Sequence, residues 1–199
     1  MNSHLFTIDR GSFGEFRRSL NTTSYRYQII EDPTGKAPLK EVEVFEVRPG
    51  DSGKDQYYND TKNDRERSEI SEISKDQFPG NEFWYGFYLF FPEDYPNVYP
   101  VKVSLGQFHQ KDTNPAWMFE NEDGGYWLFE QINGSIGHKY KLIDDENLRD
   151  RWHKVEIHIK WPKKKDGFLD LWIDQDKKIE YSGKTMSGKR VYFKYGIYR

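Results

Sequence analysis

The stretch KVEIHIKW, residues 154–161, decides the class of the fold. Polarity alternates strictly along it, so that Val155, Ile157, Ile159 and Trp161 interleave with Glu156, His158 and Lys160. Successive side chains of a β-strand point to opposite faces, and such a pattern buries one face and leaves the other in water. The stretch is therefore expected to be a strand with one face in a packed core.

Strand-like stretches of the same kind follow one another along most of the chain. Clusters of Gly, Pro, Asn and Asp, which favour turns, separate them. The stretches are RYQII (26–30), KEVEVFEV (40–47), EFWYGFYLFF (82–91), VKVSLGQFHQ (101–110), YWLFEQI (126–132), FLDLWID (168–174) and VYFKYGIY (191–198). Helical patterns are scarce, with one turn expected near residues 145–150, and residues 48–64 are expected to form a long loop. The pattern predicts an all-β sandwich or barrel.

The composition limits the classes of protein to consider. The 199 residues carry a formal net charge of −3, and 17% of them are aromatic. This length suits a single domain over residues 1–199 whose core is built from large rings. A weakly acidic chain argues against a nucleic-acid partner, since nucleic-acid-binding domains usually carry a basic excess. We expect a monomer.

Features that the sequence lacks narrow the choice further. It contains no Cys, and therefore has neither a disulfide framework nor a thiolate zinc site. No apolar run approaches the roughly 20 residues of a membrane span, so no membrane partner is expected. The first residues, MNSHLFTIDRG, lack the profile of a signal peptide. The sequence leaves open whether the protein is intracellular or is secreted after removal of an export signal.

Charged residues dominate RERSEIS, residues 65–71. In a strand, Arg65, Arg67, Glu69 and Ser71 would share one face. The planar guanidinium of arginine matches a carboxylate, so Arg67 held by Glu69 could bind an acidic ligand. The alternative is a solvated edge strand with a surface ion pair, which stabilises a protein little.

Gln107 and His109 share a face in the stretch VKVSLGQFHQ. The apolar residues before them have the same parity as Gln107, so a β-bulge is expected near Gly106. No metal-binding motif such as HExxH accompanies His109, and no metal is expected in catalysis. Acidic loops near residues 51–64 and 144–150 leave room for a structural calcium ion.

The strand VYFKYGIY carries two different faces. One face has Tyr192, Lys194, Gly196 and Tyr198, and the other has Phe193, Tyr195 and Ile197. The second set is bulky and suits a core. Gly196 is expected to let a ligand approach the sheet, since glycine marks sites of close approach within strands.

An Arg, a Gln, a His, a Lys and a Tyr on neighbouring strands suit one reaction, the cleavage of a polyuronic acid by β-elimination. The sugar carboxylate is neutralised, the C5 proton is removed and the departing O4 is protonated. Developing negative charge needs donors such as Gln and Arg, as in an oxyanion hole. A neutral His, with an ordinary pKa near 6.5, can take the proton when the C5 hydrogen is anti to O4, and a Tyr can then protonate the leaving oxygen. When the hydrogen is syn to O4, the Tyr could carry out both transfers, and the sequence leaves both geometries open. The reaction requires the three strands to lie side by side.

Three segments resemble signature segments of the alginate lyases of polysaccharide lyase family 7. They are RSEIS (67–71), QFH (107–109) and YFKYGIY (192–198), against Arg-Ser/Thr-Glu-Leu, Gln-Ile/Val-His and Tyr-Phe-Lys-Ala-Gly-x-Tyr in that family. The wider frame, over about residues 40–199, is similar to the heparin-lyase-I-like and glucuronan lyase group. Tyr195 stands where family 7 has Ala, which we expect to change packing beneath the sheet rather than chemistry.

The resemblance implies a β-jelly roll of the concanavalin-like type, with two antiparallel sheets and a concave substrate groove. It implies that Gln107 and Arg67 neutralise the carboxylate, that His109 is the base and that Tyr198 is the acid. Lys194 would contact the substrate or tune Tyr198. The other substrate-binding residues expected are Glu69, Arg65 and Tyr192. The partner would be an anionic polysaccharide such as alginate or glucuronan, cleaved without a cofactor.

An alternative of another class is a non-catalytic carbohydrate-binding module with the same sandwich fold. Such modules bind sugars on aromatic rings, and six tryptophans could supply them: Trp84, Trp117, Trp127, Trp152, Trp161 and Trp172. Fold alone does not decide between the two. A binding module has no need for a Gln-His-Tyr set, which favours the lyase.

Overall fold

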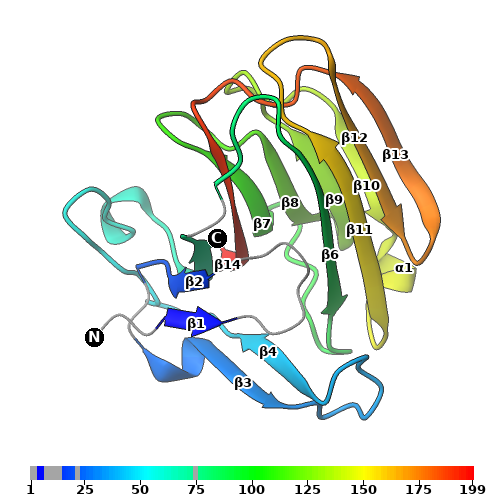
Figure 1. The fold of residues 1–199 in the computed structure, drawn as a ribbon. Coiled ribbons are helices and arrows are strands. Elements are labelled where there is room, and N and C mark those ends of the chain that lie inside the picture. The colour runs from blue at the N-terminus through cyan, green and yellow to red at the C-terminus, as the bar shows by residue number, and fades with distance from the viewer. Residues whose placement is uncertain (1–3, 7–14, 21–22, 74–75) are drawn as a thin grey trace.

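The computed structural model describes residues 4–6, 15–20, 23–73 and 76–199, and all structural statements below refer to these residues (Figure 1). The strands are β1 (His4–Phe6), β2 (Glu15–Arg18), β3 (Tyr27–Glu31), β4 (Glu41–Phe45), β5 (Arg67–Glu72), β6 (Glu82–Phe90), β7 (Val103–Gln110), β8 (Trp117–Glu122), β9 (Gly125–Glu130), β10 (Lys139–Ile143), β11 (Trp152–Lys160), β12 (Gly167–Ile173), β13 (Asp176–Gly183) and β14 (Val191–Tyr198). The helices described are α1 (Asp145–Leu148), at the expected turn, and two 3-10 turns, Ser24–Arg26 and Thr61–Asn63. Within these residues no helix is long and apolar enough to cross a membrane.

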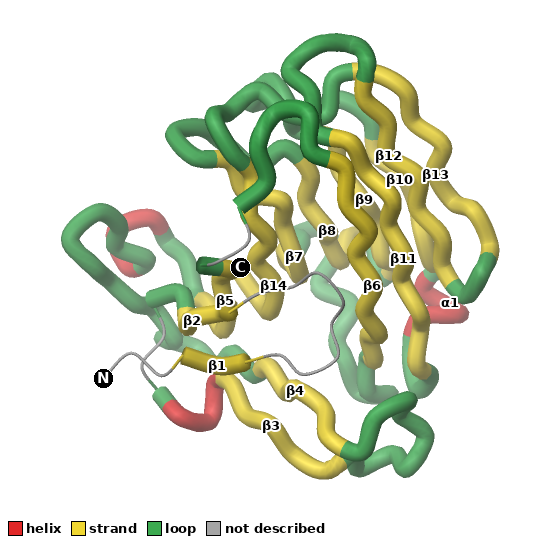
Figure 2. The backbone as a smooth tube through the Cα atoms, in the orientation of Figure 1, coloured by secondary structure: helices red, strands yellow, loops and turns green. Residues whose placement is uncertain are grey.

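Two antiparallel sheets pack face to face (Figure 1, Figure 2). The larger sheet has eight strands in the order β1-β2-β5-β14-β7-β8-β9-β10, and the smaller has four in the order β13-β12-β11-β6. A separate hairpin pairs β3 with β4. The arrangement confirms the predicted all-β jelly-roll sandwich.

Large rings and branched aliphatic side chains fill the space between the sheets. Val155 and Ile157 of β11 are buried, as their alternation predicts. The ring centroid of Phe108 on β7 lies 5.1 Å from that of Trp161 and 5.0 Å from that of Tyr85 on the opposing β6. Burying one such side chain stabilises the fold by about 1.5–3 kcal/mol. Rings from the two sheets thus hold the sandwich together.

The sequence did not predict β1, β2, β8, β10 and β13. In β8, Glu120 and Asn121 are 1% and 0% exposed, so polar and apolar residues are buried alike and no alternation shows. β13 is the edge strand of the four-stranded sheet, and most of its residues are exposed. An exposed edge strand needs no apolar face, which removes the signal.

The strand expected from residue 65 begins later, at Arg67. The expectation that Arg65 shares a strand face with Arg67 is wrong. The backbone N–H of Arg65 donates to the carbonyl oxygen of Asp60 at 3.0 Å and closes a turn before the strand. The Arg65 side chain is exposed, whereas every residue of β5 is buried.

A bulge near Gly106 was predicted, and the pairing of β7 with β8 shifts register between Ser104 and Gly106. The pairing of β14 with β7 shifts there too, with Gly196 and Ile197 opposite one residue of β7. Gly196 has φ of +129°, and a Cβ there would lie 2.1 Å from the carbonyl oxygen of Ser68. The glycine is therefore required by the approach of two backbones rather than by space for a sugar.

Candidate active site

Strands β5, β14 and β7 are neighbours in the eight-stranded sheet. Tyr198 of β14 pairs with Arg67 of β5, and Lys194 and Tyr192 pair with residues of β7. The side of this sheet away from the core is called the open face below. In these three strands it carries Arg67, Glu69, Ser71, Gln107, His109, Tyr192, Lys194 and Tyr198. The structure thus brings together all of the expected site residues on these strands.

Glu69 is the centre of this arrangement. Its Oε2 lies 2.5 Å from Nζ of Lys194 and 3.1 Å from Nη1 of Arg67, and its Oε1 accepts a hydrogen bond from Nε2 of Gln107 at 2.6 Å. Burial alone would raise the pKa of this carboxyl, but the charges of Lys194 and Arg67 lower it. An ionised Glu69 therefore fixes the positions of a guanidinium, an ammonium and an amide.

Asp60, from the loop before β5, binds Arg67 from another side. Nε of Arg67 lies 2.8 Å from Oδ2 of Asp60, and Nη2 lies 2.5 Å from Oδ1. The two side chains are 6% and 0% exposed, so the alternative of a surface ion pair on a solvated edge strand is wrong. Burial alone would lower the pKa of Arg67, but the hydrogen bonds to Asp60 and the charge of Glu69 raise it. The guanidinium is already engaged by two carboxylates.

His109 is half-buried and has one ring nitrogen engaged. Its Nδ1 lies 2.9 Å from the carbonyl oxygen of Gln110, which can only accept a hydrogen bond. Nδ1 therefore carries the proton, and Nε2 of the neutral ring keeps a lone pair. Burial, followed by the positive charge of Lys194, lowers the pKa of His109 to about 4. At neutral pH the ring is uncharged and can accept a proton.

Tyr198, in contrast to His109, is held in its protonated form. Cζ of Arg67 lies 4.4 Å from its ring centroid, and its hydroxyl lies 3.1 Å from that of Tyr58. Burial and then the hydrogen bond with Tyr58 raise the pKa of Tyr198 to about 12. The expectation that Lys194 tunes Tyr198 has no support in this geometry, because Nζ of Lys194 is bound to Glu69. Tyr198 is a phenol at neutral pH and can donate a proton.

Gln107 and Lys194 lie between His109 and Tyr198 on the open face. His109 pairs with Tyr192, six residues before Tyr198 on β14. At about 3.3 Å per residue, the backbones of His109 and Tyr198 are separated on the order of 15–20 Å. Both side chains stand on the open face and span part of this distance. The remaining gap suits a sugar ring lying over Gln107 and Lys194.

Tyr192 and Arg65 border this gap. The ring of Tyr192 stacks on His109, with centroids 5.1 Å apart and planes 27° apart. Burial and the charge of Glu69 raise the pKa of Tyr192. Arg65 lies outside the strands, but its charge acts on Tyr198 and lowers the pKa of that phenol, against the larger effect of burial.

Asp60 and Tyr58 are site residues that the sequence reasoning missed. Both lie in the polar loop 48–64, which carries no periodic pattern. The arginine with a carboxylate two positions on was visible in the sequence, but the second carboxylate comes from a turn. No signal in the sequence shows that this turn folds back onto β5.

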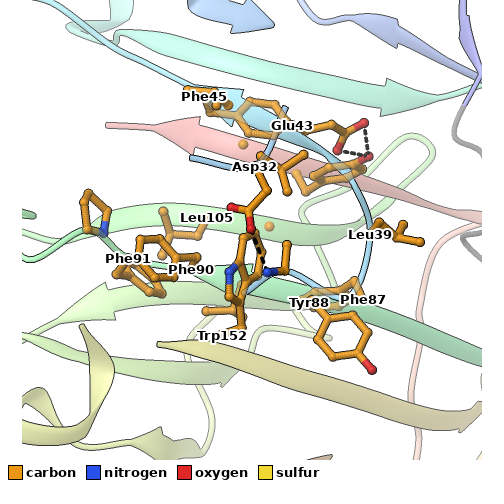
Figure 3. Close-up of a pocket in the computed structure, with 18 of the residues that line it drawn as sticks. Asp32, Leu39, Glu43, Phe45, Phe87, Tyr88, Phe90, Phe91, Leu105 and Trp152 are labelled. Atoms are coloured by element: carbon orange, nitrogen blue, oxygen red, sulfur yellow. Dashed lines mark hydrogen bonds between the residues drawn. The ribbon is translucent and has the colours of Figure 1, made fainter. Parts of the chain in front are cut away.

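A cavity of about 570 Å³ lies away from the open face, between the β3–β4 hairpin and the sandwich (Figure 3). Its walls are mainly apolar, and Leu39, Phe87 and Trp152 are among the residues that line it. The carboxylate of Asp32 accepts backbone hydrogen bonds from Thr34, Lys36 and Ala37. Asp32 therefore stabilises a turn of the hairpin, and none of Glu69, Arg67, Gln107 and Lys194 lines the cavity.

The described part of the chain gathers no group of three or more His, Cys, Asp or Glu side chains that could hold a metal ion. In the acidic loop 48–64, Asp51 binds Arg26 at 2.8 Å and Asp60 binds Arg67. These carboxylates serve ion pairs within the protein.

Comparisons with known proteins agree with the fold. A family model described as polysaccharide lyase matches residues 11–199. No curated protein matches the chain. An endo-beta-1,4-glucuronan lyase from the fungus Trichoderma reesei is similar in structure, with a TM-score of 0.65 and 17% identity over 100% of this chain and 84% of that one. The family 7 alginate lyase AlgAT5 has a TM-score of 0.54 and 18% identity over 88% and 71% of the two chains.

A third solved structure, the family 7 alginate lyase A1-II′ in complex with a substrate, has a TM-score of 0.54 and 16% identity over 89% of this chain and 73% of that one. Identities this low show a shared fold. The family model spans nearly the whole chain, including β5, β7 and β14. The chain belongs to the polysaccharide lyases.

Proposed function

We propose that the protein cleaves a uronic-acid-containing polysaccharide by β-elimination. The observation that carries the proposal is a proton acceptor and a proton donor on the same open face. His109 is uncharged with a free Nε2, and Tyr198 keeps its phenolic proton. A base and an acid that flank one sugar are what the reaction needs.

The carboxylate of the cleaved sugar would lie over Gln107. Nε2 of Gln107 has two N–H groups, and one of them donates to Glu69. The other is available to the substrate, with the charges of Lys194 and Arg67 beside it. Because Glu69 already holds these three groups, they need no rearrangement when negative charge develops. We assign Arg67 an effect through its charge, since its own N–H groups bind Asp60 and Glu69.

The proton transfers balance as follows. Nε2 of His109 takes the proton from C5, and the electron pair of that bond forms a C4=C5 double bond. The C4–O4 bond breaks, its electrons go to O4, and Tyr198 gives O4 its phenolic proton. One product has an unsaturated uronate at its end and the other has a new hydroxyl. Exchange with water returns a proton to Tyr198 and removes one from His109.

The test is a panel of polyuronates: alginate, glucuronan and glycosaminoglycans. We expect the ultraviolet absorbance of the C4=C5 bond to rise with at least one of them, and to do so after treatment with a chelator. A loss of activity together with a lower melting temperature after chelation would indicate a structural calcium ion. Binding across the panel without any unsaturated product would replace this proposal by a carbohydrate-binding module.

A further inference from the structure

The cations near the candidate site differ in whether a carboxylate already binds them. Arg67 is bound to Asp60 and Glu69, and Lys194 is bound to Glu69. Farther along the open face the lysines are paired as well: Lys102 with Glu120, Lys139 with Glu122 and Lys141 with Asp144. Arg17 of β2 is exposed and makes no ion pair within the described part of the chain. Its guanidinium is therefore available to an anionic ligand.

Two observations place Arg17 on the open face. Its neighbour Phe16 is buried and contacts Tyr195 in the core, so Arg17 points the other way. In the register of the sheet, Arg17 pairs with Ser71, Ser71 with Lys194, and Lys194 with Gln107. Arg17 therefore stands in the same cross-strand row as the proposed carboxylate site.

The distance along this row shows which carboxylate Arg17 can meet. Three strand spacings separate Arg17 from Gln107, which is about 14 Å at the usual spacing. Side chains stand roughly perpendicular to a sheet, so at this separation the two residues do not converge on a single carboxylate. A polymer lying along the row, across the strands, would bring another of its uronate units to Arg17.

Tyr192 connects Arg17 to the His109 side of the site. The charges of Arg190 and Arg17 both act on the phenol of Tyr192, whose ring stacks on His109. Arg190 is paired with Asp76, which leaves Arg17 as an unpaired guanidinium among the described residues at this end. The polymer would thus extend from the cleaved unit past Tyr192 toward Arg17.

We propose that Arg17 forms a second carboxylate-binding subsite, which holds a uronate unit of the same polymer beyond the unit that is cleaved. The inference rests on the proposed function, because it takes the ligand to be a polyuronate. Arginine suits this task, since its fork can bind a carboxylate through two parallel hydrogen bonds. Such a subsite lets the enzyme distinguish long chains from short ones, and its contribution falls at high ionic strength.

The test compares Arg17→Ala and Arg17→Lys with Arg151→Ala, an exposed arginine that precedes β11 in the other sheet. Steady-state kinetics are measured on the cleaved polyuronate and on its oligomers of increasing length. For long chains, Arg17→Ala should raise KM about ten-fold, the scale of one charge-assisted hydrogen bond, with kcat unchanged. Arg17→Lys should recover part of the loss, and Arg151→Ala should behave as wild type. The shortest oligomers that are still cleaved should not distinguish the variants.

An equal loss on short and long substrates, or an unchanged KM on the polymer, would overturn the proposal. A calorimetric titration of long-chain polyuronate into Tyr198→Phe, with and without Arg17→Ala, separates this inference from the proposed function. If wild type gives no unsaturated product, elimination fails, yet a weaker affinity in the double variant would still support the subsite. Equal affinities would reject the subsite whether or not elimination occurs.

Discussion

The two sheets of the sandwich each turn one face away from the core, and the two faces are built differently. On the four-stranded sheet the ion pairs are exposed, as between Lys177 and Glu180, with 36% and 78% of their side chains accessible. Exposed rings lie among them, with Trp84 stacked on His158 at 4.1 Å. On β5, β14 and β7 the pairs are buried, and the side chains of Lys194 and Glu69 are 11% and 3% exposed.

The difference in burial distinguishes an ordinary solvated surface from a candidate binding site. An exposed ion pair contributes at most about 1 kcal/mol, so the four-stranded face needs no explanation beyond solubility. A buried ion pair often stabilises no better than apolar residues of the same size, because removing charges from water costs several kcal/mol. A buried network such as Asp60–Arg67–Glu69–Lys194 is therefore poorly explained by stability. We propose instead that it holds charges in place for a ligand.

The sharpest test of this comparison replaces one tyrosine on each face by phenylalanine. Tyr198→Phe keeps the ring but removes the proposed acid, and should lower kcat by about 10²–10⁴-fold with KM nearly unchanged. Tyr88→Phe, on the four-stranded face where Tyr88 is 45% exposed, should leave both constants unchanged. Release of the unsaturated product, followed by ultraviolet absorbance, measures both. Near wild-type turnover in a folded Tyr198→Phe variant would show that Tyr198 is not the acid.

The second test compares one carboxylate from each face by stability. Glu69→Gln removes the charge that Lys194 and Arg67 share, and should lower the free energy of unfolding by about 3–5 kcal/mol. Glu180→Gln, which breaks the exposed pair with Lys177, should lower it by less than about 1 kcal/mol. Urea unfolding at neutral pH gives both values. Equal values would mean that the two faces do not differ in the way described.

The third test uses pH. The pKa of His109 is lowered to about 4 in the folded protein, against an ordinary value near 6.5. The folded state therefore binds this proton more weakly than the unfolded chain does. His109 favours folding above about pH 6.5, and this contribution is lost as the pH falls through about 4. Wild type should lose more stability than His109→Gln between these values.

The same shift predicts the acid limb of the reaction. If His109 is the base, kcat/KM should rise with pH through an apparent pKa near 4, rather than near 6.5. A pH series of kcat/KM in wild type measures this limb. An apparent pKa near 6.5 would mean that the base is more exposed to solvent than His109 is in this structure.

The smallest expected effect comes from Tyr58. Its hydrogen bond raises the pKa of Tyr198, so Tyr58→Phe should lower that pKa from about 12 and bring the basic limb of the kcat profile to lower pH. Turnover at neutral pH should fall a few-fold, because the acid is less well positioned. Tyr57→Phe is the matched control, since Tyr57 is 86% exposed on the same loop. An unmoved basic limb in Tyr58→Phe would remove Tyr58 from the site.

The sequence predicted the elements with strong alternation and the three strands that carry the site. The pattern Val155–Ile157–Ile159 and the same-face pairs Gln107/His109 and Lys194/Tyr198 were read correctly because each depends on a local period of two. Strands without that period, such as β8, were missed. The alternative of a module with tryptophan platforms also depends on burial that a sequence does not show. Trp117 and Trp161 lie in the core, whereas Trp84 is exposed.

Contacts between distant segments account for what was missed at the site. Asp60 and Tyr58 reach Arg67 and Tyr198 through a turn with no periodic pattern. The binding of the Arg67 guanidinium by a second carboxylate depends on that turn. Nor does the local pattern show that Arg17 lies in the row of Gln107, because this depends on a strand far away in the sequence. Oligomeric state, localisation and metal requirement stay predictions.

The place of β14 between β5 and β7 also determines when the enzyme can form. During synthesis, β5 and β7 leave the ribosome more than eighty residues before β14, at about 5–20 residues per second. Until β14 inserts, the eight-stranded sheet exists only as two separate halves, each with an unpaired edge. Pairings this distant in sequence are slow to form, and unpaired edges invite aggregation. The strand that carries Lys194 and Tyr198 is thus also the one that joins the halves, so the candidate site assembles only when this strand inserts.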